Sequence, residues 1–120
     1  MMTKKNMLNE KCFEFSLLVI NTHEELVEKG LNYKLYEKFL LSGTNIGASV
    51  RGSETLKKKT EKIKHLRIAI KHTIESKKAI KDVYKKEDYI DETLFEKLIT
   101  QVNFLKNLLE EIIEAGGYDE

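Results

Sequence analysis

The sequence contains no proline and no tryptophan, and it has a single cysteine in 120 residues. Without proline, nothing in the chain forces a helix to break. Cys12 has no partner for an intrachain disulfide, and its place in an apolar run predicts a small buried hydrophobic residue. No segment approaches the ~20 consecutive apolar residues that a membrane-spanning helix needs. These absences favour a helical protein without a membrane segment.

Apolar and charged residues are both abundant, at 41% and 34% of the chain. This combination is typical of a folded, strongly helical protein, and the length predicts one domain over residues 1–120. The N-terminal charges and the apolar run after them resemble a secretion signal. However, Glu14 interrupts the run and no small-residue cleavage site follows it. We therefore expect a cytoplasmic protein.

Apolar residues recur at helical spacing in four segments, and no β-alternation competes with this pattern. Gly30 is a C-cap candidate for the first segment, and Asp91 is an N-cap candidate for the fourth. The apolar residues of the first segment include Phe13, Leu17, Ile20 and Val27. We predict helices over residues 9–29, 32–52, 56–86 and 91–115. The short connections between them predict an all-α, antiparallel, up-down-up-down four-helix bundle.

The stretch "LLSGTNIGASVRGSE", residues 40–54, holds three glycines and three serines between helical patterns. In a helix, Phe39, Gly43 and Ile46 fall on one stripe, so the apolar register continues through the glycines. Each interior glycine costs about 1 kcal/mol relative to alanine, so a helix here requires another helix to approach closely. The predicted close-packing residues are Gly43, Ile46, Gly47 and Ala48. A flexible loop is the alternative, and the spacing matches no phosphate-binding motif.

The same stretch resembles the "SGTSIGAN" signature of a family of bacterial four-helix-bundle proteins, first noticed as open reading frames in 23S rRNA intervening sequences. Asn45 and Ser49 depart from that signature. A second family signature, "RIALKEA.ET", is similar to "LRIAIKHTIES", where His72 replaces a usual glutamate. The resemblance covers residues 13–113. The matching positions are Ser42, Gly43, Thr44, Ile46, Gly47, Ala48, Arg67, Ile68, Ala69, Lys71 and Glu75.

The resemblance implies a four-helix bundle that assembles as a homopentamer and has no catalytic activity. The accessory variability determinant of diversity-generating retroelements is similar in fold and assembly to this family. That protein binds nucleic acid and partners a reverse transcriptase. The resemblance therefore implies self-association, with nucleic acid and a reverse transcriptase as further candidate partners.

Residues 12–20, "CFEFSLLVI", contain only two polar residues, Glu14 and Ser16. A helix that is apolar nearly all round is buried on more than one side, whereas a four-helix bundle needs one apolar face from each helix. We predict a second buried surface against another subunit in a closed, ring-like homo-oligomer. An unusually wide core stripe is the alternative. The predicted subunit interface comprises Phe13, Phe15, Leu18 and Val19.

Charge is distributed very unevenly, although the net charge of the chain is only +1. Residues 57–86 hold eleven lysines and Arg67 against three acidic residues, a net charge of +9. Residues 87–120 carry a net charge of −8. Within the basic segment, lysines recur every seven residues and would form a slowly drifting stripe on a helix. That row comprises Lys57, Lys64, Lys71, Lys78 and Lys85.

A lysine row of this kind fits phosphate groups without reading sequence, so it predicts salt-sensitive binding to structured RNA or DNA. The candidate nucleic-acid-binding residues are Lys57, Lys58, Lys64, Arg67, Lys71, Lys78, Lys85 and Lys86. Two alternatives stay open. The row pairs with the acidic fourth helix of its own or a neighbouring subunit, or it is a solvated face.

Catalytic and metal sites have little support in the sequence. Di-iron bundles use Glu-x-x-His pairs, and none of His23, His65 and His72 has a glutamate three residues before it. No nucleophile–base pair or paired-carboxylate arrangement is evident. Glu75, within the basic segment, is interpreted as the local ion-pair partner of Lys71 and Lys78. We expect no enzyme activity, no metal and no cofactor.

Overall fold

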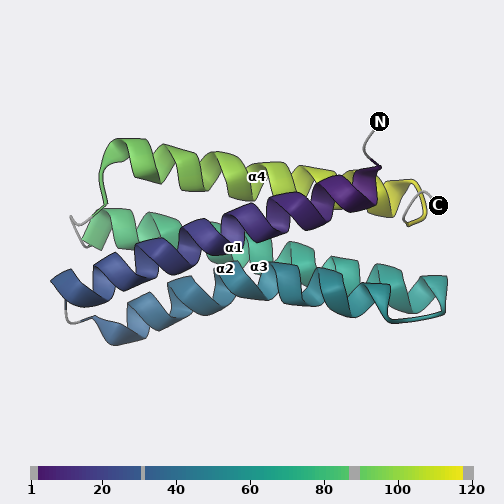
Figure 1. Cartoon of the computed structure of the whole chain (residues 1–120), viewed down its shortest axis with the longest axis horizontal. Coiled ribbons are helices and arrows are strands. Elements are labelled where there is room, and N and C mark those ends of the chain that lie inside the picture. The colour runs from purple at the N-terminus through teal and green to yellow at the C-terminus, as the bar shows by residue number, and fades with distance from the viewer. Residues whose placement is uncertain (1–2, 31, 87–89, 118–120) are drawn as a thin grey trace.

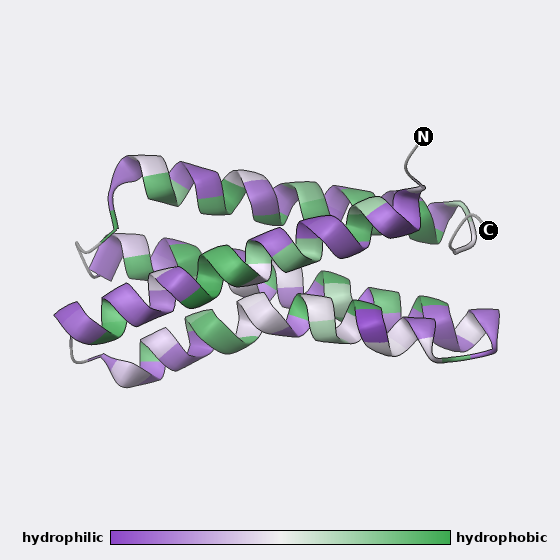
Figure 2. Ribbon diagram, viewed as in Figure 1, coloured by the Kyte–Doolittle hydropathy of each residue, from purple (hydrophilic) through white to green (hydrophobic). Residues whose placement is uncertain are grey.

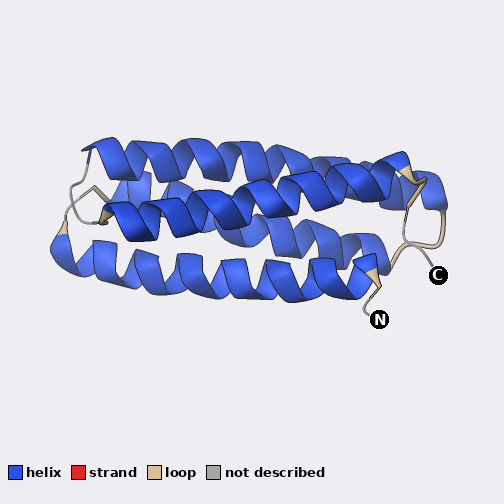
Figure 3. Cartoon of the chain, turned by 90° about the horizontal axis from the view of Figure 1, so that it is seen from above, coloured by secondary structure: helices blue, strands red, loops and turns tan. Residues whose placement is uncertain are grey.

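All regular structure in the described part of the chain, residues 3–30, 32–86 and 90–117 of the computed structural model, is helical. The helices lie lengthwise beside one another in a body of 44 × 27 × 18 Å (Figure 1). Seen from above, the ends of the helices lie at the two ends of this body (Figure 3). The prediction of an all-α protein with four helices is confirmed. The helices are α1 (Lys4–Lys29), α2 (Tyr33–Glu54), α3 (Lys59–Lys86) and α4 (Glu92–Glu114).

Side-chain caps define where three of the helices begin. The Thr3 hydroxyl accepts a hydrogen bond from the Asn6 N–H at 3.1 Å, so α1 begins at Lys4 instead of the predicted residue 9. Asn32 caps α2, and the predicted cap Asp91 accepts from the Leu94 N–H at 2.8 Å. α3 begins three residues later than predicted, because residues 55–58 form the turn after α2.

Each helix packs against two others. Among the described residues, α2 contacts α1 and α3, and α4 contacts α3 and α1, whereas no Cα atoms of the diagonal pairs lie within 8 Å of each other. The core therefore lies where four apolar faces meet, and Figure 2 shows hydrophobic and hydrophilic bands on every helix. None of the described helices is long and apolar enough to cross a membrane. The largest fully buried side chains include Phe15, Leu26, Tyr36, Phe39, Ile46, Leu66, Ile80, Leu98, Leu105 and Ile112.

The glycine-rich stretch is an uninterrupted part of α2, so the loop alternative is wrong. A Cβ atom at Gly43 would lie 2.8 Å from Val19 Cγ2, and one at Gly47 would lie 3.6 Å from Cys12 Cβ. The absence of a side chain at Gly43 lets α1 approach the backbone of α2, whereas a Cβ atom at Gly47 would make only ordinary van der Waals contact with α1. Ala48, grouped with them in the sequence, is exposed instead, because one more residue turns it to the outer side of α2.

Several small hydroxyl-bearing residues of α2 and α3 are buried. Ser42 and Ser53 of α2 and Thr73 of α3 are each at most 4% exposed. Their hydroxyls donate to carbonyls of their own helices, at 2.8 Å to Lys38 O, 2.6 Å to Val50 O and 2.6 Å to Ile70 O, respectively. These bonds satisfy the three hydroxyls within their own helices.

We expect Gly43→Ala to lower the free energy of unfolding by about 1–2 kcal/mol, because the new methyl group overpacks against Val19. Gly47→Ala is the matched control. The atom nearest to its Cβ is Arg51 Nη1 at 3.1 Å, the end of a flexible side chain. This control should gain up to about 1 kcal/mol from helix propensity. Urea denaturation of both variants measures the difference, and equal stability would contradict the close contact.

Candidate nucleic-acid interface

The basic side chains predicted to bind nucleic acid are all solvent-exposed. Lys57 and Lys58 lie in the connection before α3, so they do not continue the helical row. Four lysines remain at regular spacing and are called the outer lysine row: Lys64, Lys71, Lys78 and Lys85. The row spans about 32 Å along α3 at 1.5 Å per residue. It lies opposite the buried residues Leu66, Thr73 and Ile80, so it faces solvent.

The positions one residue after the outer lysine row do not form a second basic row. His65 and His72 are half-buried, and Ala79 is fully buried. A Cβ atom at Gly52 of α2 would lie 3.3 Å from His65 Cδ2, so this histidine turns toward α2. The basic surface of α3 is therefore narrower than the sequence pattern implies.

Among the described residues, the ion pairs are Lys11–Glu14 at 3.2 Å and Lys106–Glu110 at 3.6 Å, each within one helix. No lysine or arginine of α3 lies within 4.0 Å of a carboxylate in the described part of the chain. The predicted local ion pair of Glu75 with Lys71 and Lys78 is accordingly not formed. Glu75 lies instead beside a groove toward Lys34 and Lys38 of α2.

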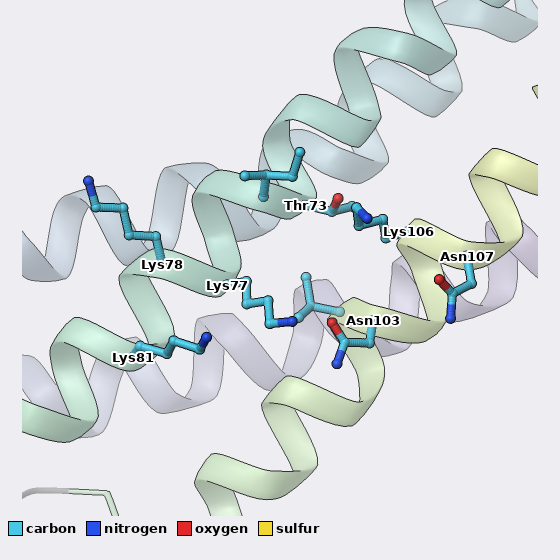
Figure 4. Close-up of a pocket in the computed structure, with 9 residues that line it drawn as sticks. Thr73, Lys77, Lys78, Lys81, Asn103, Lys106 and Asn107 are labelled. Atoms are coloured by element: carbon cyan, nitrogen blue, oxygen red, sulfur yellow. The ribbon is translucent and has the colours of Figure 1, made fainter.

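A groove of about 660 Å³ runs between α3 and α4 (Figure 4). We call it the α3–α4 groove. Lysine side chains come to it from both helices, and Lys77 and Lys81 extend toward the α4 wall while Lys78 points the other way. The groove is lined by Thr73, Ile74, Lys77, Lys78, Lys81, Val102, Asn103, Lys106 and Asn107.

Three of these groove lysines, Lys77, Lys81 and Lys106, were absent from the predicted binding residues. Lys77 and Lys81 are four residues apart, a spacing that places them on one helix face, so the sequence contained a signal for that pair. Lys106 carries no such signal. It belongs to a segment of net charge −8, and only the packing of α4 on α3 brings it to the groove.

The exposed apolar surface on α1 differs from the predicted subunit interface. Phe15 and Val19 are fully buried in the core of the single chain, and Leu18 packs partly against that core. Phe13 does lie outside, at 62% exposure. Phe13 belongs to an exposed apolar row that we call the α1 apolar stripe. The other members of this row are residues of the apolar periodicity that predicted the first helix. The α1 apolar stripe comprises Phe13, Leu17, Ile20 and Val27, all more than one-third exposed.

Groups for metal or thiol chemistry do not converge in the structure. No set of three His, Cys, Asp or Glu side chains among residues 3–30, 32–86 and 90–117 could hold a metal ion. Cys12 is 3% exposed, as predicted for a small buried residue. Burial raises the pKa of its thiol to about 12, an effect that Arg51 opposes and Glu54 reinforces. A thiol with this pKa is not an activated nucleophile.

One solved structure of high similarity is a crystal structure of a protein of unknown function from the S23 ribosomal protein family of Bacteroides thetaiotaomicron. It aligns with a TM-score of 0.86 and 28% sequence identity, over 92% of this chain and 98% of that chain. No protein-family model matches the chain, and a search of curated proteins finds no match. The likeness supports the four-helix fold over nearly the whole chain.

We expect Cys12 to make folding less favourable at alkaline pH. Its folded pKa of about 12 exceeds its ordinary value of 9.0, so the folded state retains a proton that the unfolded state loses above pH 9. The free energy of unfolding should fall by about 1.4 kcal/mol more in the wild type than in Cys12→Ala between pH 8 and 10. Denaturant titrations at the two pH values measure this. If the free energy of unfolding depended on pH equally in both proteins, the folded state would not keep the Cys12 thiol protonated.

Proposed function

We propose that this chain is a non-catalytic, self-assembling helical scaffold that binds nucleic acid through the basic side of α3. The observation that carries the proposal is the exposure of the α3 cations without a carboxylate within 4.0 Å among the described residues. Ammonium groups that are not neutralised by the protein attract phosphates and release their counterions on binding. The charge of the segment is therefore available to a polyanion.

The expected ligand is structured or double-stranded RNA or DNA. Lysine contacts phosphates as a point charge, so binding is salt-sensitive and reads little sequence. No aromatic side chain interrupts the outer lysine row, whereas proteins that hold single strands stack bases on aromatic rings. A double-stranded backbone offers phosphates along the ~32 Å of the row without requiring stacking.

The α1 apolar stripe supports the assembly part of the proposal. Phe13, Leu17 and Ile20 present a continuous apolar row to solvent, and such rows mark interaction surfaces. We propose that antiparallel up-down-up-down bundles join through this stripe into a closed ring, because closed symmetry buries the stripe of every subunit. The number five and the association with a reverse transcriptase rest on the family resemblance alone.

The alternative is a purely structural or protein-binding oligomer in which basic α3 and acidic α4 pair within or between subunits. One observation favours it. Arg67 and Lys71 of α3 line a groove together with Glu110 and Glu114 of α4, so opposite charges already face one another there. Under this alternative, the wild-type protein does not bind nucleic acid. Replacing the α3 lysines with neutral residues would then weaken assembly.

We expect simultaneous Lys→Gln changes at Lys64, Lys71, Lys78 and Lys81 to weaken binding to a duplex RNA. The slope of log affinity against log salt should fall by about 0.9, or somewhat less, for each lysine that contacts a phosphate. Fluorescence anisotropy at several salt concentrations measures this slope. The control carries the same change at four exposed lysines outside α3, namely Lys29, Lys34, Lys38 and Lys97.

Light scattering measures the mass of the assembly formed by each variant. Together with RNA binding, this mass distinguishes nucleic-acid binding from charge pairing between helices. Weaker RNA binding with unchanged mass in the α3 variant alone supports the proposal. Loss of mass in that variant supports charge pairing between subunits. Equal RNA binding by both variants and the wild type would rule out α3 as the binding surface.

We expect Leu17→Glu to dissociate the assembly, because it buries a carboxylate in an apolar contact between copies. Leu41→Glu is the matched control. Leu41 of α2 is 47% exposed, against 49% for Leu17, but it lies outside the α1 apolar stripe. Size-exclusion chromatography with light scattering should show monomers for the first variant only. An unchanged oligomer in both would place the interface elsewhere.

A further inference from the structure

The α3–α4 groove differs in charge from neighbouring grooves on the surface. Its lining contains four lysines and no carboxylate. In contrast, Arg67 and Lys71 face Glu110 and Glu114 in the next groove along the same two helices. The grooves lined by Lys34 and Lys38 and by Lys11 likewise include glutamates. The lysines of the α3 wall have no carboxylate within 4.0 Å among the described residues, and Lys106 of the α4 wall is paired with Glu110 outside the lining, so the groove attracts an anion from both walls.

The direction of the lysine side chains separates the groove from the outer lysine row. Lys77 and Lys81 extend from α3 toward α4, and Lys106 extends from the α4 side (Figure 4). Lys77 and Lys106 are half-buried, so part of each stem is ordered against the protein. A phosphate between the walls contacts two helices at once, whereas one on the outer lysine row contacts a single helix.

The polar atoms and apolar surface of the groove also fit a sugar–phosphate strand. Asn103 and Asn107 lie one turn apart on α4, and their amides make no hydrogen bond to any described residue. They are available to donate to phosphate oxygens or to ribose hydroxyls. Ile74, 54% exposed, supplies an apolar surface on the opposite wall, against which a sugar ring can lie.

We infer that the α3–α4 groove, and not the outer lysine row, holds the backbone of the bound nucleic-acid strand. The α3 wall from Thr73 to Lys81 is about 12 Å long. One strand of a duplex presents a phosphate every ~3.4 Å of helix axis, so a groove that follows the axis takes about three consecutive phosphates. The inference rests on the proposed function and assigns its principal phosphate contacts to Lys77, Lys81 and Lys106.

Glu110 modulates this site through Lys106. Their side chains form an ion pair at 3.6 Å within α4, and both are partly exposed. A phosphate in the groove competes with Glu110 for the same ammonium group. Glu110→Gln releases Lys106 and should raise affinity about twofold, the size of a typical helical ion pair. Glu110 also lines the next groove with Arg67 and Lys71, so the gain identifies the α3–α4 groove only if it disappears when Lys106→Gln is present as well.

The test compares two triple variants on one duplex RNA by fluorescence anisotropy. The groove variant carries Lys77→Gln, Lys81→Gln and Lys106→Gln, and the row variant carries Lys64→Gln, Lys71→Gln and Lys85→Gln. Both remove three charges, so their net charges are equal. The groove variant should lose about tenfold or more in affinity and lower the salt slope by about 2–3, and the row variant should change both much less. Circular dichroism confirms that both remain helical.

The outcomes distinguish this inference from the proposed function. A larger loss in the row variant, or no gain from Glu110→Gln, overturns the groove assignment while nucleic-acid binding itself stands. Wild-type affinity in both triple variants overturns the proposed function. Inorganic pyrophosphate is the competitor that separates a strand from a free anion. Pyrophosphate binding as tight as RNA binding at matched ionic strength would identify a small-anion site and overturn the strand assignment.

Discussion

The contact between Val19 of α1 and the bare backbone at Gly43 of α2 determines how the bundle is built. A Cβ atom there would lie 2.8 Å from Val19 Cγ2, so no larger residue fits without movement. The close approach commits Val19 and its neighbour Phe15 to the core of the single chain. The α1 apolar stripe is left outside the core as a result. One packing contact thus sets both the inner face of α1 and the surface offered to other molecules.

One face of α3 is packed in the core, and the opposite face carries lysine and arginine side chains. Its inner face is buried and includes small residues such as Ala69, Thr73 and Ser76, and the hydroxyl of Thr73 is satisfied within its own helix. Its cations, in contrast, have no carboxylate within 4.0 Å among the described residues. The acidic residues of α4 form no ion pair with them, although Glu110 and Glu114 share a groove with Arg67 and Lys71 and the two segments nearly cancel in net charge. Charge balance along a sequence is therefore a poor measure of charge balance on a surface.

Local features of the fold were predictable because each depends on residues close together in sequence. The Asp91 cap and the helical character of the glycine-rich stretch follow from neighbouring residues, and both are present. The start of α1 was missed because Thr3, one polar residue before a basic run, caps the helix ahead of the first apolar residue. In the candidate site, the exposed lysines of α3 were predicted from their spacing. The contribution of Lys106 was not, because it comes from another helix.

The sequence by itself determined that the chain is helical, roughly where each helix lies and that α3 is basic, since helix periodicity and segment charge are local properties. It did not determine which of two apolar stripes on α1 is inside. Phe13 and Leu17 follow the helical period as well as Phe15 and Val19 do, and only the partner helix selects between them. Tertiary structure likewise decided that lysines of two helices share one groove. Both choices depend on which faces meet across the bundle, and a pattern within a single helix carries no information about its neighbour.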